Sequence, residues 1–292
     1  MTTLARSSET IWRVIDLIKW GEKYFSENKF DNPRKEIESL LQDILECNRV
    51  DLYLRFEEPL TKVQLTKLHG WVQRRKNREP LQYITGKAGF YNLVLNVTPG
   101  VLIPRPESER LIEVLIETIG KKSNISILDI GTGSGCLALA LGKELPKATI
   151  TGIDKSAKAI EIAQLNAETL KIDNVNFIQI DLIKNKVEGK YDIVISNPPY
   201  ISQNEIEKLM PDVKNFEPHS ALTDSADGLT FYRKILEISK EIMNLSGWLF
   251  LEVGLGEHPK KAMQLFSGGE FKNIALIKDY NGDDRVLKAQ IV

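Results

Sequence analysis

The chain has few cysteines and histidines among its 292 residues, and each shortage excludes a class of protein. The two cysteines, Cys47 and Cys136, lie far apart in the sequence, which argues against a disulfide scaffold and a structural zinc site. The three histidines, His69, His219 and His258, lack the spacing of metal ligands. We therefore expect an intracellular protein that needs no metal ion.

The sequence also lacks a long apolar run, a signal peptide and an excess of one charge. Its first residues, MTTLARSSETIWRV, do not show the basic-then-apolar pattern of a signal peptide, and no apolar run approaches the length of a membrane span. Lys and Arg number 39 and Asp and Glu 40, so the basic surplus typical of nucleic-acid or membrane-surface binders is missing. We expect a cytoplasmic protein that contacts no membrane and does not bind nucleic acid sequence-specifically.

Residues 1–80 show the spacing of amphipathic helices and predict a small helical bundle. One stripe of apolar residues is expected to face inward in 11–25: Ile11, Val14, Ile15, Ile18 and Phe25. Asn32 and Pro33 are typical of a helix start, and Thr61 and Gln64 have the spacing of a capping box. A bundle of this kind is usually a partner-binding domain. The basic run RRKNR fits either a solvated helix end or a site for an acidic or RNA-containing partner.

The segment 81–98 alternates between apolar and polar residues, with Gly86 and Gly89 around an expected turn. This pattern predicts a β-hairpin. Two prolines in VLIPRPESE then force an extended segment before a helix that starts near Ser108. We expect residues 81–103 to link the bundle to a second domain, residues 104–292.

In the second domain, short β-rich runs alternate with helical stretches. The expected strands are 125–130, 148–154, 175–181, 191–196 and 248–253, and the clearest helices between them are 156–171 and 229–244. Such alternation predicts an α/β fold with a parallel sheet covered on both faces. The last two strands, 272–278 and 285–292, are joined by only six residues, too few for a crossover, so they should be antiparallel neighbours.

The segment ILDIGTGSGC combines a strand, a glycine-rich turn and a helix start. Its glycines let the backbone pass close to a ligand, and the helix start offers free N–H groups. The third glycine lies one place too early for the dinucleotide fingerprint, and the carboxylate of Asp129 suits an ammonium group better than a pyrophosphate. The candidate ligand-binding residues here are Asp129, Gly131, Thr132, Gly133, Ser134 and Gly135.

Two further carboxylates end the following strands. Asp154 ends the second strand, where it can accept both hydroxyls of a ribose, and Asp181 with Leu182 ends the third, where the pair suits the edge and face of an adenine. Singly, the glycine turn could be tight packing and Asp154 a helix N-cap. Together, an ammonium, a ribose and an adenine describe S-adenosylmethionine, bound at the carboxyl ends of the strands.

The fourth strand ends in the tetrapeptide Asn197-Pro198-Pro199-Tyr200. A proline-stiffened turn is the simplest interpretation of this motif. Beside a methyl donor it suits a grip on a planar nitrogen, whose lone pair is delocalised and whose NH₂ group needs acceptors to hold it. The carbonyl of the Asn197 side chain and that of the Pro198 backbone can accept the two N–H bonds, the prolines fix the geometry in advance, and Tyr200 can pack on the flat group.

These motifs, together with the segments IPRPESE, FEPHSAL and DGLTFYRKI, resemble the release factor glutamine methyltransferases, the HemK/PrmC family. The resemblance runs from about residue 79 to the end. It implies a class I methyltransferase fold (Rossmann-like), with a mostly parallel seven-stranded sheet, an antiparallel last strand and a small helical N-terminal domain.

The same resemblance implies a reaction. The chain would transfer a methyl group from S-adenosylmethionine, giving S-adenosylhomocysteine, to the side-chain nitrogen of the glutamine in the Gly-Gly-Gln loop of peptide chain release factors. Asn197, Pro198 and Tyr200 would be the catalytic residues, with Pro199 also contacting the glutamine and Asn197 also the cofactor. Arg105 and Glu107 would help to wall the glutamine pocket. The family usually has threonine where Ser108 stands, and a glycine pair where Ser225-Ala226 stands.

Two other activities share both halves of this site. An adenine-N6 methyltransferase acting on DNA or RNA would use the same tetrapeptide, but the chain has no basic surplus for phosphate contacts. A glutamine methyltransferase acting on a ribosomal protein is closer still, and only the EPHSAL segment and the N-terminal bundle weigh against it. Which release factors are accepted, and the oligomeric state, are not evident from the sequence.

Overall fold

The computed structural model describes residues 11–121 and 124–292. The chain divides into two compact units, Met1–Thr85 and Gly86–Val292. The first unit is helical, as predicted, and the second contains all the strands of both sheets in the described residues.

The N-terminal unit packs its helices around one apolar core. They are α1 (Val14–Glu27), α2 (Pro33–Leu45), α3 (Arg49–Leu54), α4 (Lys62–Lys76) and α5 (Leu81–Thr85). Val14, Ile18 and Phe25 are buried as expected, but Ile11 precedes α1 and is 68% exposed, so its predicted place in the apolar stripe is wrong. The capping box of Thr61 and Gln64 is confirmed, whereas Asn32 occupies the N-cap position of α2 without a side-chain cap.

The basic run at the end of α4 is a solvated helix end only in part, because Lys76 and Asn77 are exposed whereas Arg75 is buried. The Arg75 side chain is buried and donates two hydrogen bonds to Glu36, at 2.6 and 3.0 Å. The guanidinium groups of Arg75 and Arg78 lie 4.6 and 4.0 Å from the ring centroid of Phe30. Helix propensity and charge cannot show such partners, because Glu36 and Phe30 lie on distant segments.

The second unit begins with a hairpin of β1 (Lys87–Phe90) and β2 (Leu93–Asn96). The hairpin is shorter than expected, because residues 81–85 form α5. The predicted turn was also misplaced: Gly89 lies within β1, and the turn residues are Tyr91 and Asn92, with φ of 44° and 58°. Both residues are left-handed, as the tight turns of hairpins require.

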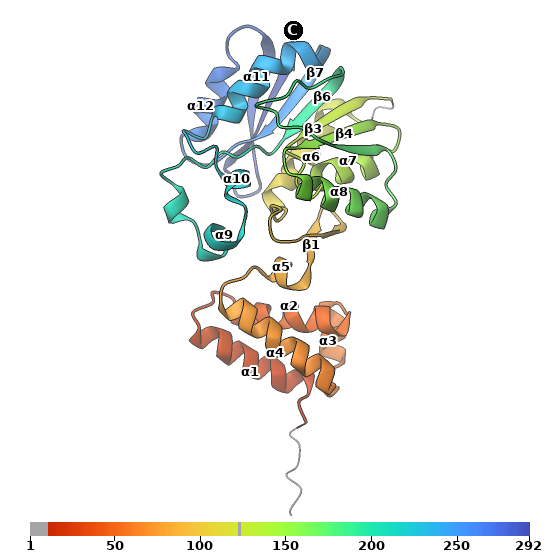
Figure 1. Cartoon of the computed structure of the whole chain (residues 1–292), viewed down its shortest axis with the longest axis vertical. Coiled ribbons are helices and arrows are strands. Elements are labelled where there is room, and N and C mark those ends of the chain that lie inside the picture. Colours follow the sequence, from red (N-terminus) through yellow and green to blue (C-terminus); the bar gives the residue numbers. More distant parts are fainter. Residues whose placement is uncertain (1–10, 122–123) are drawn as a thin grey trace, which may run out of the picture. The chain divides into compact units, whose positions relative to one another are not determined.

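The main sheet has seven strands in the order β5-β4-β3-β6-β7-β9-β8. Figure 1 labels β4, β3, β6 and β7 of this sheet. The bounds of the seven strands are β3 (Ser126–Ile130), β4 (Thr149–Asp154), β5 (Val175–Gln179), β6 (Tyr191–Ser196), β7 (Met243–Glu252), β8 (Phe271–Lys278) and β9 (Asp284–Ile291). The pairs from β5 to β7 are parallel, and β9 runs antiparallel to both of its neighbours. The predicted α/β class and antiparallel last strand are confirmed.

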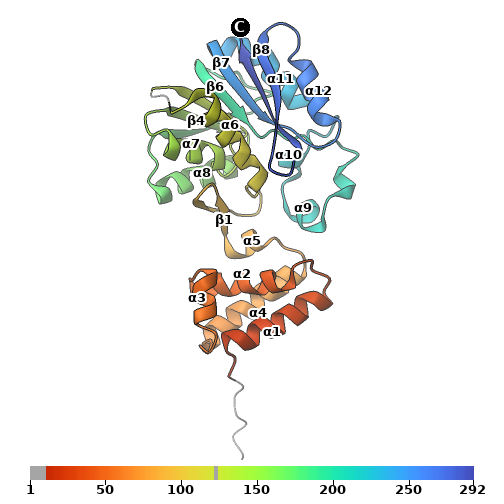
Figure 2. The same ribbon diagram turned by 180° about the vertical axis from the view of Figure 1, so that it is seen from behind.

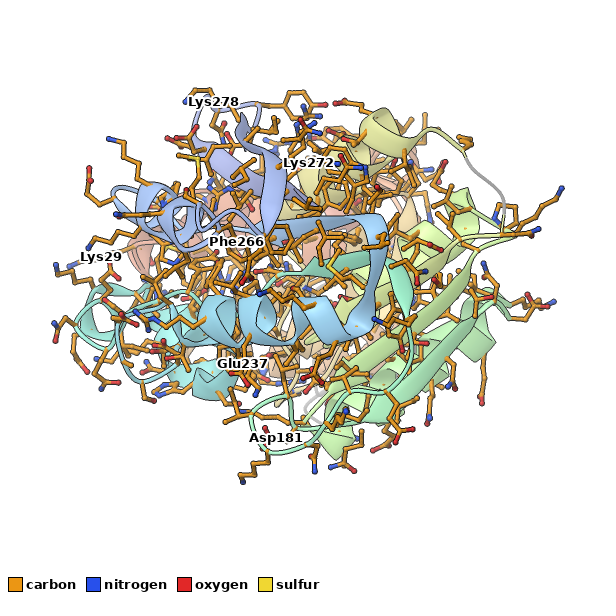
Figure 3. The ribbon with its side chains drawn as sticks, turned by 90° about the horizontal axis from the view of Figure 1, so that it is seen from above. Lys29, Asp181, Glu237, Phe266, Lys272 and Lys278 are labelled. Atoms are coloured by element: carbon orange, nitrogen blue, oxygen red, sulfur yellow. The ribbon has the colours of Figure 1, made fainter. Side chains whose placement is uncertain are left out.

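Helices cover both faces of this sheet (Figures 1 and 2). On one face, α6 (Glu109–Ile119), α7 (Cys136–Glu144) and α8 (Ala157–Leu170) share a core with strand residues such as Ile127 and Ile195. On the other, α11 (Thr230–Ile242) and α12 (His258–Leu265) pack over Leu128 and Val194. Figure 3 labels the exposed Glu237 on α11 and the buried Phe266 after α12.

Short helices complete the connections: η1 (Pro106–Ser108) before α6, and η2 (Ile206–Lys208), α9 (Pro211–Phe216) and α10 (His219–Leu222) between β6 and α11. Within the described ranges, no helix is long and apolar enough to cross a membrane.

The strand order reverses between β3 and β6. The chain adds β4 and β5 on one side of β3 and then returns to place β6 on its other side. In open α/β sheets a crevice forms at the carboxyl ends of the strands at such a switch point, and ligands bind there. The glycine loop follows β3 and the Asn197 tetrapeptide follows β6, so both lie at this point.

Candidate active site

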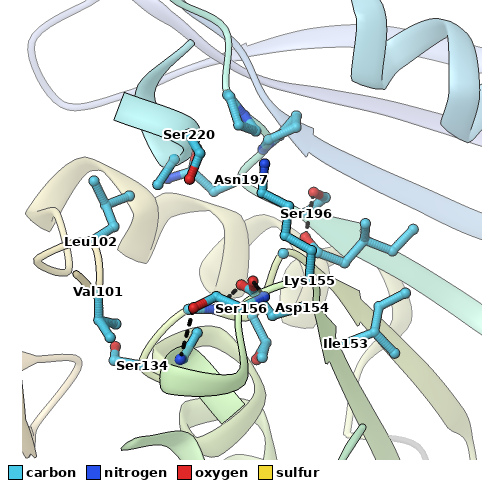
Figure 4. A pocket seen from close by; sticks show the side chains of 18 of the residues that line it. Val101, Leu102, Ser134, Ile153, Asp154, Lys155, Ser156, Ser196, Asn197 and Ser220 are labelled. Carbon is cyan, nitrogen blue, oxygen red and sulfur yellow. Dashed lines mark hydrogen bonds between the residues drawn. The ribbon is translucent and has the colours of Figure 1, made fainter. Parts of the chain in front are cut away.

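A cleft lies at the carboxyl edge of the sheet, with about 1110 Å³ of space between its walls, part of it open to solvent. Figure 4 shows Asp154 and Ser156 on one side of the cleft and Ser196 and Asn197 on another. Its lining comes from five parts of the second unit: the segment 100–108, the glycine loop, the residues after β4 and β5, the residues after β6, and the region of α10 and α11.

The glycine loop needs its glycines for two different reasons. Gly131, Gly133 and Gly135 all have left-handed backbones, with φ of 74°, 56° and 82°. A Cβ on Gly131 would meet no other atom within 4 Å, so this glycine leaves space open beside the loop. A Cβ on Gly135 would lie 2.9 Å from the ring of Phe177, so this one allows close packing of the helix on the sheet. Gly131 and Gly133 line the cleft, but Gly135 does not.

Backbone hydrogen bonds tie this loop to the end of β4. The N–H groups of Gly131 and Thr132 both donate to the carbonyl of Ile153, at 2.8 and 2.9 Å. The side chains of Thr132 and Ser134 are buried and belong to the lining. These contacts fix the loop against the neighbouring strand through the protein's own backbone.

Asp129 lies behind the loop. Its side chain is 1% exposed, is not part of the lining, and accepts a 2.6 Å hydrogen bond from the Thr132 hydroxyl. Burial raises the pKa of Asp129 to about 7. In this structure the carboxyl therefore braces the loop from the interior. Its contact with a ligand ammonium remains a prediction.

Asp154 lines the cleft at the end of β4 and holds two backbone groups. Its Oδ2 accepts from the N–H of Gly133 at 3.0 Å, and its Oδ1 accepts from the N–H of Ser156 at 2.9 Å. Burial raises its pKa. The helix α8 is capped by Ser156, whose hydroxyl accepts from Ala159 N–H, so the alternative role of Asp154 as N-cap is wrong.

Asp181 and Leu182 line the cleft beyond β5. The strand ends at Gln179, two residues earlier than expected, so Asp181 lies in the following loop rather than in the strand. Its Oδ1 accepts from the N–H of Ile183 at 3.0 Å, while Leu182 is buried. An acidic edge and an apolar surface are therefore adjacent here.

The segment after β6 forms the opposite wall. Asn197, Pro198 and Pro199 line the cleft, and Ser196 anchors them through a 2.6 Å hydrogen bond to the carbonyl of Ile130 in β3. The Asn197 side-chain NH₂ donates to the hydroxyl of Ser108 at 2.9 Å. This contact leaves the Asn197 carbonyl oxygen as the acceptor that the side chain can offer to another group.

Tyr200 is not among the lining residues. It packs beside His258, with ring centroids 5.9 Å apart, and its hydroxyl donates to Glu252 at 3.3 Å. Burial raises the pKa of Tyr200, so it stays neutral. The His258 ring is itself held between the N–H of Gly254 and the carbonyl of Gly228.

The two residues carried over from the PRPESE segment are placed differently. Arg105 lines the cleft, and its guanidinium donates to the buried carboxylate of Glu217 at 2.5 Å. Glu217 also accepts from the N–H of Ile103 at 3.3 Å, so it joins the segment 100–108 to the residues before α10. Glu107 is partly exposed and does not belong to the lining. Arg105 thus supports the wall, and Ser108 reaches the cleft in place of Glu107.

The loop in which Ser225-Ala226 replaces the usual glycine pair keeps a left-handed residue, since Ser225 has φ of 59°. Asp224 holds its shape by accepting hydrogen bonds from the N–H groups of Ala226 and Gly228 at 2.8 and 3.0 Å. These hydrogen bonds hold the loop in a shape that places Gly228 beside the backbone of Tyr200.

Sequence reasoning missed three residues of the site: Ser108, Glu217 and Glu252. The hydroxyl of Ser108 donates to Glu252 at 2.5 Å, although 144 residues separate them. The available signal for Glu252 was a lone carboxylate at the end of the apolar run WLFLE. For Glu217 it was the carboxylate within the segment FEPHSAL.

Solved structures place this fold among methyltransferases. A methyltransferase from Pyrococcus furiosus aligns over 67% of this chain and 87% of its own, with a TM-score of 0.51 and 19% identity. The 16S rRNA N2 G1207 methyltransferase of Thermus thermophilus aligns over 70% of this chain and 50% of its own, with a TM-score of 0.52 and 19% identity. Residues 108–213 also match the model of the methyltransferase small domain. The second unit therefore has a methyltransferase fold.

Closer relatives identify the family. The release factor glutamine methyltransferase of Geobacter sulfurreducens is 39% identical over 96% of this chain and 98% of its own. That of Thermodesulfovibrio yellowstonii is 42% identical over 90% and 94%. Residues 16–86 match the model of the PrmC N-terminal domain. The chain belongs to the release factor glutamine methyltransferase family.

Proposed function

We propose that this chain transfers a methyl group from S-adenosylmethionine to the side-chain amide nitrogen of the glutamine in the Gly-Gly-Gln loop of peptide chain release factors. The observation that carries this proposal is the juxtaposition of two motifs. The glycine loop and the Asn197 tetrapeptide follow β3 and β6, which are adjacent strands, and both line one cleft. Family membership supports the nature of the acceptor.

The residues of the cleft fit S-adenosylmethionine. Gly131 leaves open space beside the loop, Asp154 presents a partly buried carboxylate for the ribose, and Asp181 with Leu182 offers a polar edge and an apolar face for the adenine. When bound, this cofactor supplies an activated methyl group. The protein then has only to hold and orient the cofactor. Because backbone hydrogen bonds fix the glycine loop, little entropy is lost when the loop holds a ligand.

The acceptor side must hold a poor nucleophile. The amide nitrogen of glutamine is delocalised, so its NH₂ group has to be gripped by acceptors that also turn it toward the methyl donor. The Asn197 side-chain carbonyl and the Pro198 backbone carbonyl provide two such acceptors in the cleft wall. Pro198 and Pro199 restrict the backbone there, so little freedom is lost on binding.

The nitrogen needs no strong base in this scheme. Its proton can leave to solvent after the new carbon–nitrogen bond has formed, and the side chains of the cleft wall supply orientation. Tyr200, the last residue of the tetrapeptide, packs beside His258, where it stays neutral and hydrogen-bonded to Glu252.

The test is incubation with methyl-labelled S-adenosylmethionine and a release factor whose Gly-Gly-Gln glutamine is intact or replaced. We expect label only on the intact factor, on the glutamine side chain. A ribosomal protein and an adenine-containing DNA duplex serve as rival acceptors. Label on the glutamine-replaced factor, or preferential labelling of a rival, would overturn the proposal.

The Asn197→Ala variant tests the acceptor role within the same assay. It should bind S-adenosylhomocysteine with nearly unchanged affinity and lose turnover by at least about 100-fold, since it removes an acceptor from the reacting group. Turnover near that of the unmodified chain would show that Asn197 does not hold the acceptor nitrogen.

A further inference from the structure

Behind Asn197 lies a chain of buried polar groups that ends in a carboxylate. The Asn197 NH₂ donates to the Ser108 hydroxyl at 2.9 Å, and that hydroxyl donates to Glu252 at 2.5 Å. Ser108 and Glu252 are 2% and 1% exposed, so water does not compete for these bonds. The three residues come from the segment after β6, from η1 and from the end of β7.

The direction of these hydrogen bonds follows from one constraint. An ionised carboxylate accepts hydrogen bonds but donates none. The single proton of the Ser108 hydroxyl must therefore point to Glu252, and only the lone pairs of this hydroxyl face Asn197. The Asn197 amide must then present its NH₂ group to Ser108, which leaves its carbonyl oxygen for another partner.

We infer that Glu252 acts through Ser108 as a positioning residue, which fixes the amide of Asn197 with its carbonyl oxygen turned toward the acceptor nitrogen. This inference rests on the proposed function. Without the carboxylate, the amide could rotate by half a turn and present its NH₂ group to another NH₂ group. The two donors would repel, and the acceptor nitrogen would lose one of the two carbonyls that hold it.

The same carboxylate supports the other end of the tetrapeptide. Its second oxygen accepts the hydroxyl of Tyr200 at 3.3 Å, while the hydroxyl of Tyr232 donates to the Glu252 backbone carbonyl at 2.5 Å. Glu252 thus connects, directly or through Ser108, to the first and last residues of the tetrapeptide. Glu252 is not part of the cleft lining, so it acts on the acceptor only through the residues that it positions.

The surroundings of Glu252 decide how easily it ionises. Its pKa is raised to about 7 by burial, against the opposing effects of Ser108, of the Arg285 cation on β9 and of Tyr200. The negative charge of Glu107 on η1 raises the pKa of Glu252 further. Tyr232 on α11 and Cys136 on α7 also face its charge and stay neutral, since burial raises the pKa of each. Assays at about pH 8.5 therefore keep Glu252 largely ionised.

The first experiment compares Ser108→Thr with Ser108→Val at about pH 8.5. The two replacements have the same shape and differ only by the hydroxyl. We expect the threonine variant to turn over release factor at least about 10-fold faster than the valine variant, the factor that one hydrogen bond to a charged group is worth. Both should bind S-adenosylhomocysteine alike, and the difference should appear in kcat and not in KM for the cofactor.

The second experiment follows kcat against pH for the unmodified chain and for Glu252→Gln. Turnover by the unmodified chain should rise as Glu252 ionises near pH 7. The glutamine variant should lack this rise and stay slower at high pH, because its amide can donate as well as accept. Its cofactor affinity and melting temperature provide the check on folding.

The outcomes separate the two proposals. If the unmodified chain labels no release factor, the proposed function fails. If it does, equal turnover by the threonine and valine variants overturns the positioning role, and so does an unchanged pH profile in Glu252→Gln. A loss of turnover in Glu252→Gln that is matched by lost binding of S-adenosylhomocysteine would likewise assign Glu252 a structural role only.

Discussion

The carboxylate of Asp154 accepts a hydrogen bond from the backbone N–H of Gly133 across 3.0 Å, which joins the end of β4 to the tip of the glycine loop. Its other oxygen holds the N–H of Ser156 at the start of α8. One side chain therefore fixes the loop and the helix start, and each of its oxygens keeps a further lone pair for a ligand in the cleft. The Asp154 side chain is therefore expected to act by holding these two backbone N–H groups as well as by its charge.

This arrangement makes Asp154→Asn a sharper test than truncation. The asparagine keeps the shape but places an NH₂ group against one backbone N–H, so we expect S-adenosylhomocysteine to bind roughly 10-fold to 100-fold more weakly. Calorimetric titration measures this change. The exposed Asp173→Asn provides the control, with unchanged affinity. Binding by Asp154→Asn within twofold of the unmodified chain would remove Asp154 from the cofactor site.

Gly228 tests how closely the loop before α11 must approach the tetrapeptide. A Cβ at this position would lie 2.3 Å from the backbone oxygen of Tyr200, and the φ of 81° is itself unfavourable for alanine. Gly256 shares the strain, with φ of 66°, but a Cβ there would meet no atom within 4 Å. We expect Gly256→Ala to cost about 1 kcal/mol of unfolding free energy and Gly228→Ala about 2 kcal/mol more.

Turnover should separate the same two variants even more clearly. Displacing the Tyr200 backbone moves the residues that hold the acceptor, so Gly228→Ala should lose most of its kcat while Gly256→Ala keeps it. Urea denaturation and the labelling assay together check both effects. If the two alanine variants lose the same stability and activity, the close approach to Tyr200 is not a requirement.

The residues that line the site at the carboxyl ends of the strands, here called the rim, were predictable from the sequence. Parallel strands end at the same edge of a sheet, so residues such as Gly131, Asp154 and Asn197 could be placed together without knowing any contact. The alternation of strands and helices likewise predicted the sheet and its antiparallel last strand, as the structure confirms. The assignment of individual residues to cofactor and acceptor remains a prediction.

Support behind the rim was not predictable, because it depends on which buried polar groups meet across the fold. Ser108 and Glu252 pair although 144 residues separate them, and no local pattern marks that partnership. The hairpin turn shows the local counterpart. Glycines suggested its place, whereas Tyr91 and Asn92 adopt the left-handed conformation at the tip. Asparagine tolerates that conformation well, and the turn signal lay in Asn92 rather than in Gly89.

The pH dependence of stability tests the burial of Glu252. Its pKa rises from 4.5 in the unfolded chain to about 7 in the folded one, so the folded state binds this proton more tightly. The stability that Glu252 contributes is therefore fully present below about pH 4.5 and is lost as the pH rises toward 7. The loss is on the order of 3 kcal/mol.

Comparison with Glu252→Gln isolates this effect. The difference in unfolding free energy between the glutamine variant and the unmodified chain should move in favour of the variant as the pH rises from about 4.5 to 7, and then level off. Asp129, whose pKa burial also raises to about 7, contributes equally to both proteins and cancels. A difference that is constant with pH would show that Glu252 is not desolvated in the folded state.

The ion pair of Arg75 and Glu36 should stabilise the N-terminal unit, because both side chains are largely buried, 9% and 13% exposed. Arg75→Met keeps an apolar stem but leaves the Glu36 carboxylate unpaired, so we expect the free energy of unfolding to fall by about 3 kcal/mol.

The pair of Arg13 and Glu57 provides the matched control, since its side chains are 51% and 77% exposed. Arg13→Met should lower the free energy of unfolding by less than about 0.5 kcal/mol. Urea denaturation followed by tryptophan fluorescence measures both, because the tryptophans at positions 12, 20 and 71 lie in this unit and only the one at 248 lies outside it. Equal losses in the two variants would mean that burial does not strengthen the inner pair.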